Sequence, residues 1–109
     1  MSAEFRSARV FVRDDLAGLL RETDEGYVFL YDTAYLTKDL PAISLTLPRQ
    51  AEPYISPTLF PFFDGLIPEG WLLNLVSKNW KLDPRDRFGL LLAACRDCIG
   101  AVSIREVSP

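Results

Sequence analysis

The stretch that decides the fold runs from Leu59 to Trp71 and reads LFPFFDGLIPEGW. Four of its large apolar residues recur at intervals that place them along one side of a helix; they are Phe60, Phe63, Leu66 and Ile67. Ser56 and Pro57 predict the start of this helix, because serine is a favoured N-cap and proline fits the first helical position. Pro68 ends the helix or begins the next one. The stretch therefore predicts a helix, a tight break and a second helix.

Two placements are open for Trp71, the aromatic residue that follows Pro68-Glu69-Gly70 at the break. Large apolar residues are usually buried, so this tryptophan can pack in the core beside Phe63. At the start of a helix, however, its side chain leans back over the preceding turn, where it can project outward. Tryptophan is among the residues most enriched at binding hot spots. The second placement predicts a binding surface at the break.

The first part of the chain predicts three strands joined by tight turns. Residues 9–13 alternate charged and apolar side chains, which is the period of a half-buried strand. Residues 16–21 can pair back on them after a turn at Asp14-Asp15. Residues 27–31 are entirely aromatic and aliphatic and follow a turn at Glu25-Gly26. We expect a three-stranded antiparallel meander.

The middle of the chain predicts one more strand. Residues 32–38 read as a loop or a single helical turn. Residues 42–48 alternate, and a proline at each end suits strand termini. In that strand the side chains expected to point the same way are Ile43, Leu45 and Leu47. Residues 49–55 read as a polar connection.

Two further helices and a last strand complete the prediction. Residues 71–80 have a helical apolar pattern. A third helix follows the N-cap signal Asp83-Pro84 and runs to Ala94. Its inner face is expected to hold Phe88, Leu91, Leu92 and Cys95. Residues 101–105 form a last strand. The order predicts an α+β fold: a small antiparallel sheet of about four to five strands with about three helices packed on one side.

Composition bounds the class of protein. A chain of 109 residues is one domain, and 49% hydrophobic with 25% charged residues is typical of a soluble globule. Twelve basic and 15 acidic residues give a net charge of −3, which argues against a general nucleic-acid or anionic-membrane surface and leaves room only for a local basic patch. Neither a signal peptide nor an apolar run of membrane-spanning length is present in the sequence. We expect a cytoplasmic protein.

The sequence offers little to catalysis. It contains no histidine, which removes imidazole bases, Ser-His and Cys-His nucleophile pairs and histidine metal ligands. It has no glycine-rich phosphate loop. The acidic residues of the first strands fall at expected turns, where a solvated face is expected; they are Asp14, Asp15, Glu22, Asp24 and Glu25. We therefore expect a binding module with no cofactor and no metal, and not an enzyme.

Cys95 and Cys98 have the CxxC spacing of redox and zinc sites. A structural zinc needs four ligands, and these two cysteines are the only Cys or His residues in the chain. A thioredoxin-type pair needs a helix N-terminus to lower the thiol pKa, whereas this pair follows a predicted helix end. The spacing favours two half-buried thiols, with a thiol redox protein as a weaker alternative.

Four motifs together resemble the N-terminal subdomain of HipA-type toxin kinases. They fall, in order, within residues 44–48 (SLTLP), 62–70 (FFDGLIPEG), 88–91 (FGLL) and 96–102 (RDCIGAV). The resemblance covers residues 8 to 105. The chain departs from the family at Cys95 and Cys98, where glycine and serine or alanine are usual. The kinase body that follows in HipA, with its phosphate loop and catalytic aspartates, is absent from the sequence.

The resemblance implies a role that composition and spacing do not provide. A free-standing form of this subdomain resembles the HipS family of three-gene HipBST toxin–antitoxin modules. It implies an antitoxin subunit that binds and inhibits a HipT-like Ser/Thr kinase, with a HipB-like DNA-binding protein in the same complex and no direct nucleic-acid contact. The alternative is the N-terminal structural and docking subdomain of a full-length HipA-type kinase. The residues expected to bind the partner surround the helix break: Asp64, Pro68, Glu69, Gly70 and Trp71.

Overall fold

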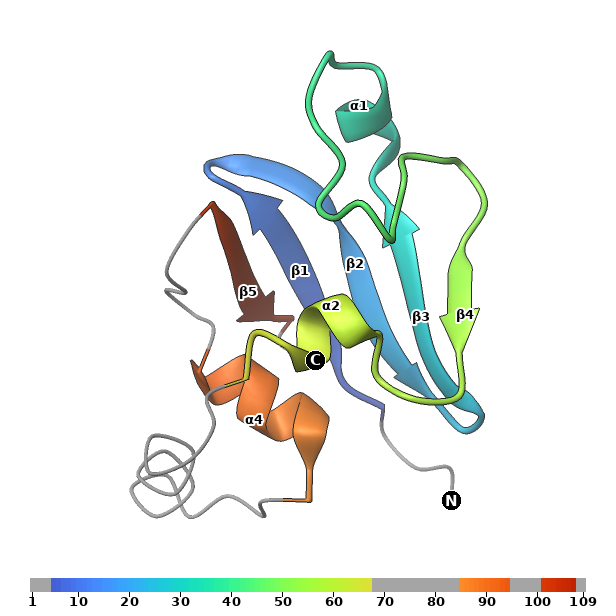
Figure 1. The fold of residues 1–109 in the computed structure, drawn as a ribbon, viewed down its shortest axis with the longest axis vertical. Helices are drawn as coiled ribbons and strands as arrows, with labels where there is room; N and C mark the ends of the chain where they lie inside the picture. Colours follow the sequence, from blue (N-terminus) through green and yellow to red (C-terminus); the bar gives the residue numbers. More distant parts are fainter. Residues whose placement is uncertain (1–4, 68–84, 95–100, 108–109) are drawn as a thin grey trace.

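The computed structural model describes residues 5–67, 85–94 and 101–107. Five antiparallel strands form one sheet in the order β4-β3-β2-β1-β5 (Figure 1). The strands are β1 (Ser7–Val12), β2 (Asp15–Thr23), β3 (Gly26–Tyr31), β4 (Tyr54–Ser56) and β5 (Val102–Glu106). The helices of the described part are α1 (Thr33–Leu36), α2 (Pro61–Asp64) and α4 (Arg87–Ala94). The predicted α+β class is confirmed.

The meander of β1, β2 and β3 is confirmed almost residue for residue. Val12 pairs with Asp15, so the first turn is made by Arg13 and Asp14, and Arg13 has a φ of 56°. The pairing shifts by one residue between Val10 and Phe11, which leaves Ala17 as an extra residue in β2. Such a bulge increases the local twist of the sheet. Alternation predicted β1, the turn after it predicted β2 as a strand pairing back, and aromatic and aliphatic composition predicted β3.

The predicted strand at residues 42–48 is wrong. Its backbone groups bond to a side chain instead of a neighbouring strand: the Tyr31 hydroxyl accepts from the Ile43 amide at 3.1 Å and donates to the Leu47 carbonyl. The chain turns sharply between Ser44 and Leu47, where the Leu47 amide donates to the Ser44 carbonyl at 3.1 Å. Ile43 and Leu47 are buried, but Leu45, at the tip of the turn, is fully exposed. The alternation in residues 42–48 therefore arises from a turn that is held by the buried Tyr31, and not from a strand.

Two predicted boundaries around α2 are also wrong. The fourth strand lies at Tyr54–Ser56, inside and just beyond the predicted polar connection, and pairs with β3. Ser56 therefore ends a strand and does not cap a helix; α2 begins at Pro61, with Phe60 as its N-cap residue and no side-chain cap. A proline does occupy the first helical position, as predicted, but it is Pro61 and not Pro57. The four-residue stripe still faces inward: three of its members are buried and Leu66 is half-buried.

The core lies between one face of the sheet and the helices α2 and α4. Its fully buried large side chains come from β1, β2, β3, β5 and all three described helices; they are Val10, Leu20, Phe29, Tyr31, Tyr35, Phe63, Phe88, Leu90, Leu91 and Ile104. The Phe63 ring centre lies 5.6 Å from that of Phe29 and 5.2 Å from that of Phe62. α2 thus joins the sheet to the rest of the core.

The third predicted helix is confirmed as α4, with a shorter start. It begins at Arg87, and the Asp86 carboxylate accepts from the Gly89 amide at 3.1 Å, as an N-cap does. Asp83-Pro84, the helix at residues 71–80, Cys95 and Cys98 lie outside the described residues. The last strand is confirmed within one residue, with Ile104 buried. In the described part of the chain, no helix is long and apolar enough to cross a membrane.

Candidate functional site

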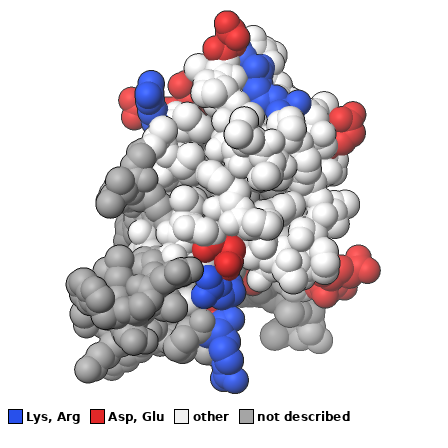
Figure 2. Space-filling model, in the orientation of Figure 1, with Lys and Arg blue, Asp and Glu red and all other residues white. Residues whose placement is uncertain are grey.

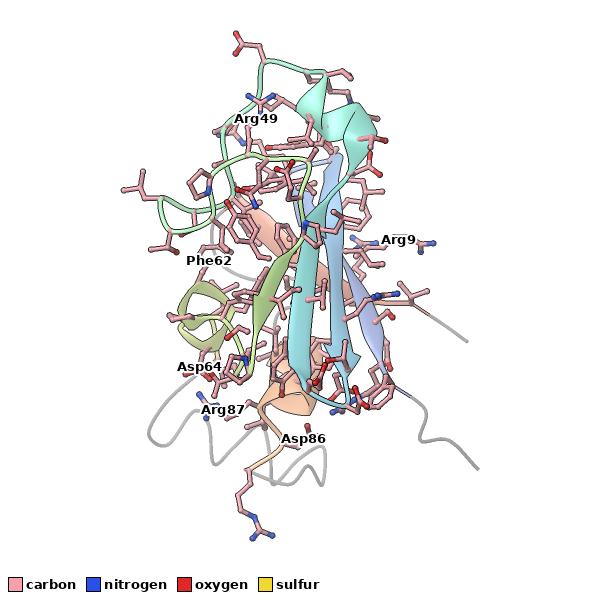
Figure 3. The ribbon with its side chains drawn as sticks, turned by 90° about the vertical axis from the view of Figure 1, so that its right-hand side faces the viewer. Arg9, Arg49, Phe62, Asp64, Asp86 and Arg87 are labelled. Carbon is pink, nitrogen blue, oxygen red and sulfur yellow. The ribbon has the colours of Figure 1, made fainter. Side chains whose placement is uncertain are left out.

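The end of α2 and the beginning of α4 meet at an ion pair. The Arg87 Nε donates to Asp64 Oδ1 at 2.7 Å, and both side chains stay partly exposed, at 34% and 44%. Figure 3 shows the two residues close together on the helix-bearing side of the sheet. Because α2 ends at Asp64 in a short helical turn packed through Phe63, the core fixes the direction of this carboxylate.

A shallow hollow of about 370 Å³ opens beside this ion pair. Its lining combines apolar and polar groups: Tyr27, Pro57, Thr58, Leu59, Asp64 and Arg87. Small-molecule sites bury most of their ligand in a closed cavity, and this hollow is open to solvent. An apolar depression with one charged pair at its rim is better suited to a side chain of a protein partner. We call the hollow and its ion pair the Asp64 corner.

A second, tighter ion network fixes the start of α4 to the sheet. The Arg6 guanidinium donates to Glu22 at 2.8 and 2.9 Å and to Asp86 at 2.9 and 2.7 Å. Its carbon also lies 5.2 Å from the centre of the Phe88 ring. One arginine therefore connects the strand β2 to the N-cap of α4. The expectation that Glu22 belongs to a solvated face is wrong, because its side chain is only 20% exposed and fully engaged.

The network determines the charge states at this end of the molecule. Its hydrogen bonds to the Arg6 guanidinium lower the pKa of the Glu22 carboxyl, and the same arginine lowers the pKa of Asp86. The two carboxylates in turn raise the pKa of Arg6. Burial raises the pKa of Tyr27, so its hydroxyl is neutral where it lines the hollow. Near neutral pH the network holds one positive and two negative charges.

Gly89, the glycine of the FGLL motif, makes room for this network. A Cβ at this position would stand 2.3 Å from the Asp86 Oδ2 and 3.0 Å from the Arg6 Nη1. Real Cβ atoms do not approach other heavy atoms so closely, so any side chain would push the capping carboxylate away from α4. The glycine therefore has a packing role in the first turn of α4.

We expect Gly89→Ala to lower the free energy of unfolding by about 1–3 kcal/mol, as overpacked buried sites do. Helix propensity alone predicts the opposite sign, a gain of about 1 kcal/mol. Urea denaturation measures the difference. The matched control is Gly65→Ala, whose added Cβ would lie 3.2 Å from the Pro61 carbonyl oxygen on an exposed residue; there we expect a change within about 0.5 kcal/mol. A stabilised Gly89→Ala protein would contradict this packing role.

Of the predicted partner-binding residues, the structure describes Asp64, which lies at the rim of the hollow. Pro68, Glu69, Gly70 and Trp71 lie outside the described residues, directly after the buried Ile67. Sequence reasoning missed Arg6 and Arg87. Neither has a local signal, because their partners lie 80 and 23 residues away along the chain.

No metal site is formed by the described residues. No group of three or more Asp, Glu, Cys or His side chains gathers among residues 5–67, 85–94 and 101–107. The carboxylates that do come close together, Glu22 and Asp86, are already bound to one guanidinium. Because their oxygens accept hydrogen bonds from Arg6, the Asp64 corner remains the candidate site in this part of the chain.

Comparison with known proteins assigns the family. A profile of the HipA N-terminal domain matches residues 8–105. An uncharacterized protein of Haemophilus influenzae (strain ATCC 51907 / DSM 11121 / KW20 / Rd) is 40% identical over 101 residues, which is 93% of this chain and 92% of that protein. A solved N-terminal domain of HipA toxin is similar with a TM-score of 0.74 and 34% identity, covering 99% of this chain and 98% of the solved chain. The chain therefore belongs to the HipA N-terminal domain family.

Proposed function

We propose that this protein is an antitoxin subunit that binds a HipT-like Ser/Thr kinase and holds it inactive. Membership of the HipA N-terminal domain family, a non-catalytic subdomain of the kinase, carries the proposal. The Haemophilus influenzae relative supports a free-standing role, because the alignment covers 92% of its length and leaves no room there for a kinase body. Inhibition would then come from binding alone.

The Asp64 corner and the helix break that follows it form the proposed kinase-binding surface. The hollow can receive a side chain of the kinase, and the Asp64–Arg87 pair at its rim can exchange hydrogen bonds with polar groups around it. Figure 2 shows the face that carries this corner: its middle is uncharged, and charged side chains lie along its margin and in one acidic–basic group below the middle. An uncharged centre with a polar rim is the usual anatomy of a protein interface.

In this proposal Trp71 is the main anchor, and Glu69 pairs with a basic group of the nucleotide pocket. The surface would occupy the active-site groove or the N-lobe of the kinase. Tryptophan is among the residue types that most often dominate the binding energy of an interface. The residues that precede the predicted break are anchored in the core, because Phe63 and Ile67 are buried.

We expect co-expression of this protein with its cognate kinase to relieve growth arrest in the absence of any DNA-binding partner. Trp71→Ala should fold, keep its melting temperature, and lose affinity by roughly 2 kcal/mol or more, about thirtyfold or more. The matched control is Leu45→Ala, which removes a fully exposed leucine from another element and should leave affinity unchanged. Rescue that always requires the DNA-binding protein would place inhibition elsewhere. A large fall in melting temperature for Trp71→Ala would make this residue part of the core.

A second candidate is the N-terminal docking subdomain of a full-length HipA-type kinase. The near-complete mutual coverage with the solved N-terminal domain of HipA toxin favours it, because that domain has the same size and fold. In this case the same corner would pack on the kinase body within one chain, and the subdomain would also offer a docking surface to a HipB-like protein. Sequencing the gene beyond the codon for Pro109 separates the two: a stop codon supports the antitoxin, and a continuing frame supports the subdomain.

A further inference from the structure

The sheet has a second face, opposite α2 and α4, that no described helix covers. Figure 3 shows the sheet almost edge-on, with Phe62, Asp64 and Arg87 on one side and Arg9 projecting from the other. Side chains alternate along each strand, so every second residue points to this open face. The arrangement leaves half of the sheet's side chains with no described element packed over them.

The strand register sorts the open face into a basic half and an aliphatic half. In one row across the sheet, Arg105 stands opposite Arg9, Arg9 opposite Leu19, and Leu19 opposite Leu30. In the next row, Ser7 stands opposite Arg21, followed by Val28 and Ile55. The basic residues lie toward β5 and β1, and the aliphatic ones toward β3 and β4. Neither row contains a carboxylate.

The arginines of this face make no ion pair with other described residues. Arg9 and Arg21 make no ion pair or side-chain hydrogen bond with other described residues, and Arg105 only lies 5.8 Å from the centre of the Phe11 ring. By contrast, Arg6 and Arg87 are each bound to carboxylates. Like charges directly opposite in a sheet are destabilising, which is the position of Arg9 and Arg105. Their clustering also runs against the chain's net charge of −3.

The aliphatic half of the open face is exposed to solvent. Ile55 is 74% exposed and Leu30 is 40% exposed, and they belong to neighbouring strands on the same face. Single exposed aliphatic residues are common on protein surfaces, but a pair next to a cluster of unpaired arginines has the composition of an interface, in which arginine and apolar residues are enriched.

We propose that the open face, defined by Arg9, Arg21, Leu30, Ile55 and Arg105, binds an acidic protein segment that lies across the strands. Its carboxylates would pair with the arginines, and its aliphatic side chains would cover Leu30 and Ile55. Four interstrand spacings of about 4.8 Å give a span of about 19 Å, or about three and a half turns of helix. This inference goes beyond the proposed function and is independent of it, because it uses the opposite face of the sheet.

A protein fits this face better than a nucleic acid does. Phosphates would pair with the arginines but would leave the exposed leucine and isoleucine uncovered. The half-buried Phe11 ring beside this face already lies next to the Arg105 guanidinium, 5.8 Å from its centre, which leaves less of it for stacking with a base. The net negative charge of the chain would also repel a polyanion at longer range. An acidic amphipathic segment matches both halves.

The test places the photo-crosslinking residue p-benzoylphenylalanine at position 30 of the full chain in its native host. We expect one protein adduct whose crosslinked peptide carries Asp or Glu residues within about four helical turns of the attachment point. Adduct yield should fall at least tenfold when Arg9→Glu and Arg105→Glu are combined, and fall less with the corresponding glutamine pair. Lys38→Glu, a reversal at an exposed residue of another element, should leave the yield unchanged.

The outcomes separate the alternatives. No adduct, an adduct with nucleic acid, an adduct with a second copy of this chain, a captured peptide without carboxylates, or a yield insensitive to the arginine reversal would each overturn the proposal. The melting temperature of each variant shows whether it folds. If the double glutamate variant does not fold, the double glutamine variant is used for the comparison. Kinase binding by the arginine variants is measured in parallel and should not change, so failure here is distinct from failure of the antitoxin proposal.

Discussion

Phe63→Ala is expected to lower the free energy of unfolding by about 3–5 kcal/mol, the usual cost of removing a buried phenylalanine. Phe63 is fully buried, and its ring packs against those of Phe29, Phe60 and Phe62. Because small domains have a total stability of about 5–15 kcal/mol, this one change removes much of it.

Urea denaturation at constant slope measures this loss, and Phe62→Ala is its matched control. Phe62 is the preceding residue of the same helix but only half-buried, so its loss should be less than half as large. The Phe63 variant should also bind the kinase more weakly, because α2 places Asp64 through this ring. Equal losses of stability for the two variants would contradict the prediction, because they would mean that the buried Phe63 contributes no more than the half-buried Phe62.

Arg6→Ala is expected to lower the free energy of unfolding by about 3 kcal/mol near neutral pH. The substitution leaves Glu22 and Asp86 as two neighbouring carboxylates without their shared cation. Breaking a fully buried pair costs about 3–5 kcal/mol, and the side chains here are a fifth to a third exposed, which places the loss at the lower end. The control is Arg9→Ala, an exposed arginine of the adjoining strand, with a change within about 0.5 kcal/mol.

The difference in stability between wild type and Arg6→Ala should depend on pH. Arg6 lowers the pKa of Glu22 and Asp86 in the folded state from their ordinary values of 4.5 and 3.8. The unfolded chain therefore takes up protons first, and the stabilisation is complete above about pH 4.5 and is lost as the pH falls through the folded pKa values. The gap between wild type and Arg6→Ala should narrow as the pH falls below about 4.5. A constant gap would mean that packing against Phe88, and not charge, is the main contribution of Arg6.

Much of the fold could be predicted from local pattern. The strands β1 and β5 alternate apolar and polar residues because each has one face against the core, and β3 is recognisable from its aromatic and aliphatic composition. The helix α4 and the apolar stripe after Pro61 follow from the same requirement at the helical period. The α+β class follows from the order of these elements. The family resemblance rests on four short motifs, each of which can be recognised in the sequence.

The failures share one cause, which is a partner that lies elsewhere in the fold. Residues 42–48 have the pattern of a strand, yet the Tyr31 hydroxyl takes the backbone bonds that a neighbouring strand would have made. Ser56-Pro57 has the pattern of a helix start, yet β3 pairs with that segment as β4. Glu22 has the setting of a solvated turn residue, yet Arg6 and Asp86 enclose it. Local propensity could not register any of these partners.

The sequence by itself determined the fold class, most of the strands and helices of the described part, and the absence of histidine, because these depend on composition and period. Only the tertiary structure decided which charges are used up and which remain available. Arg6 and Arg87 are bound to carboxylates that lie far away in the chain, whereas Arg9 and Arg105 face each other unpaired on the open sheet. Pairing is a matter of distance in space, and a Coulomb interaction weakens with that distance regardless of how many residues separate the partners in sequence.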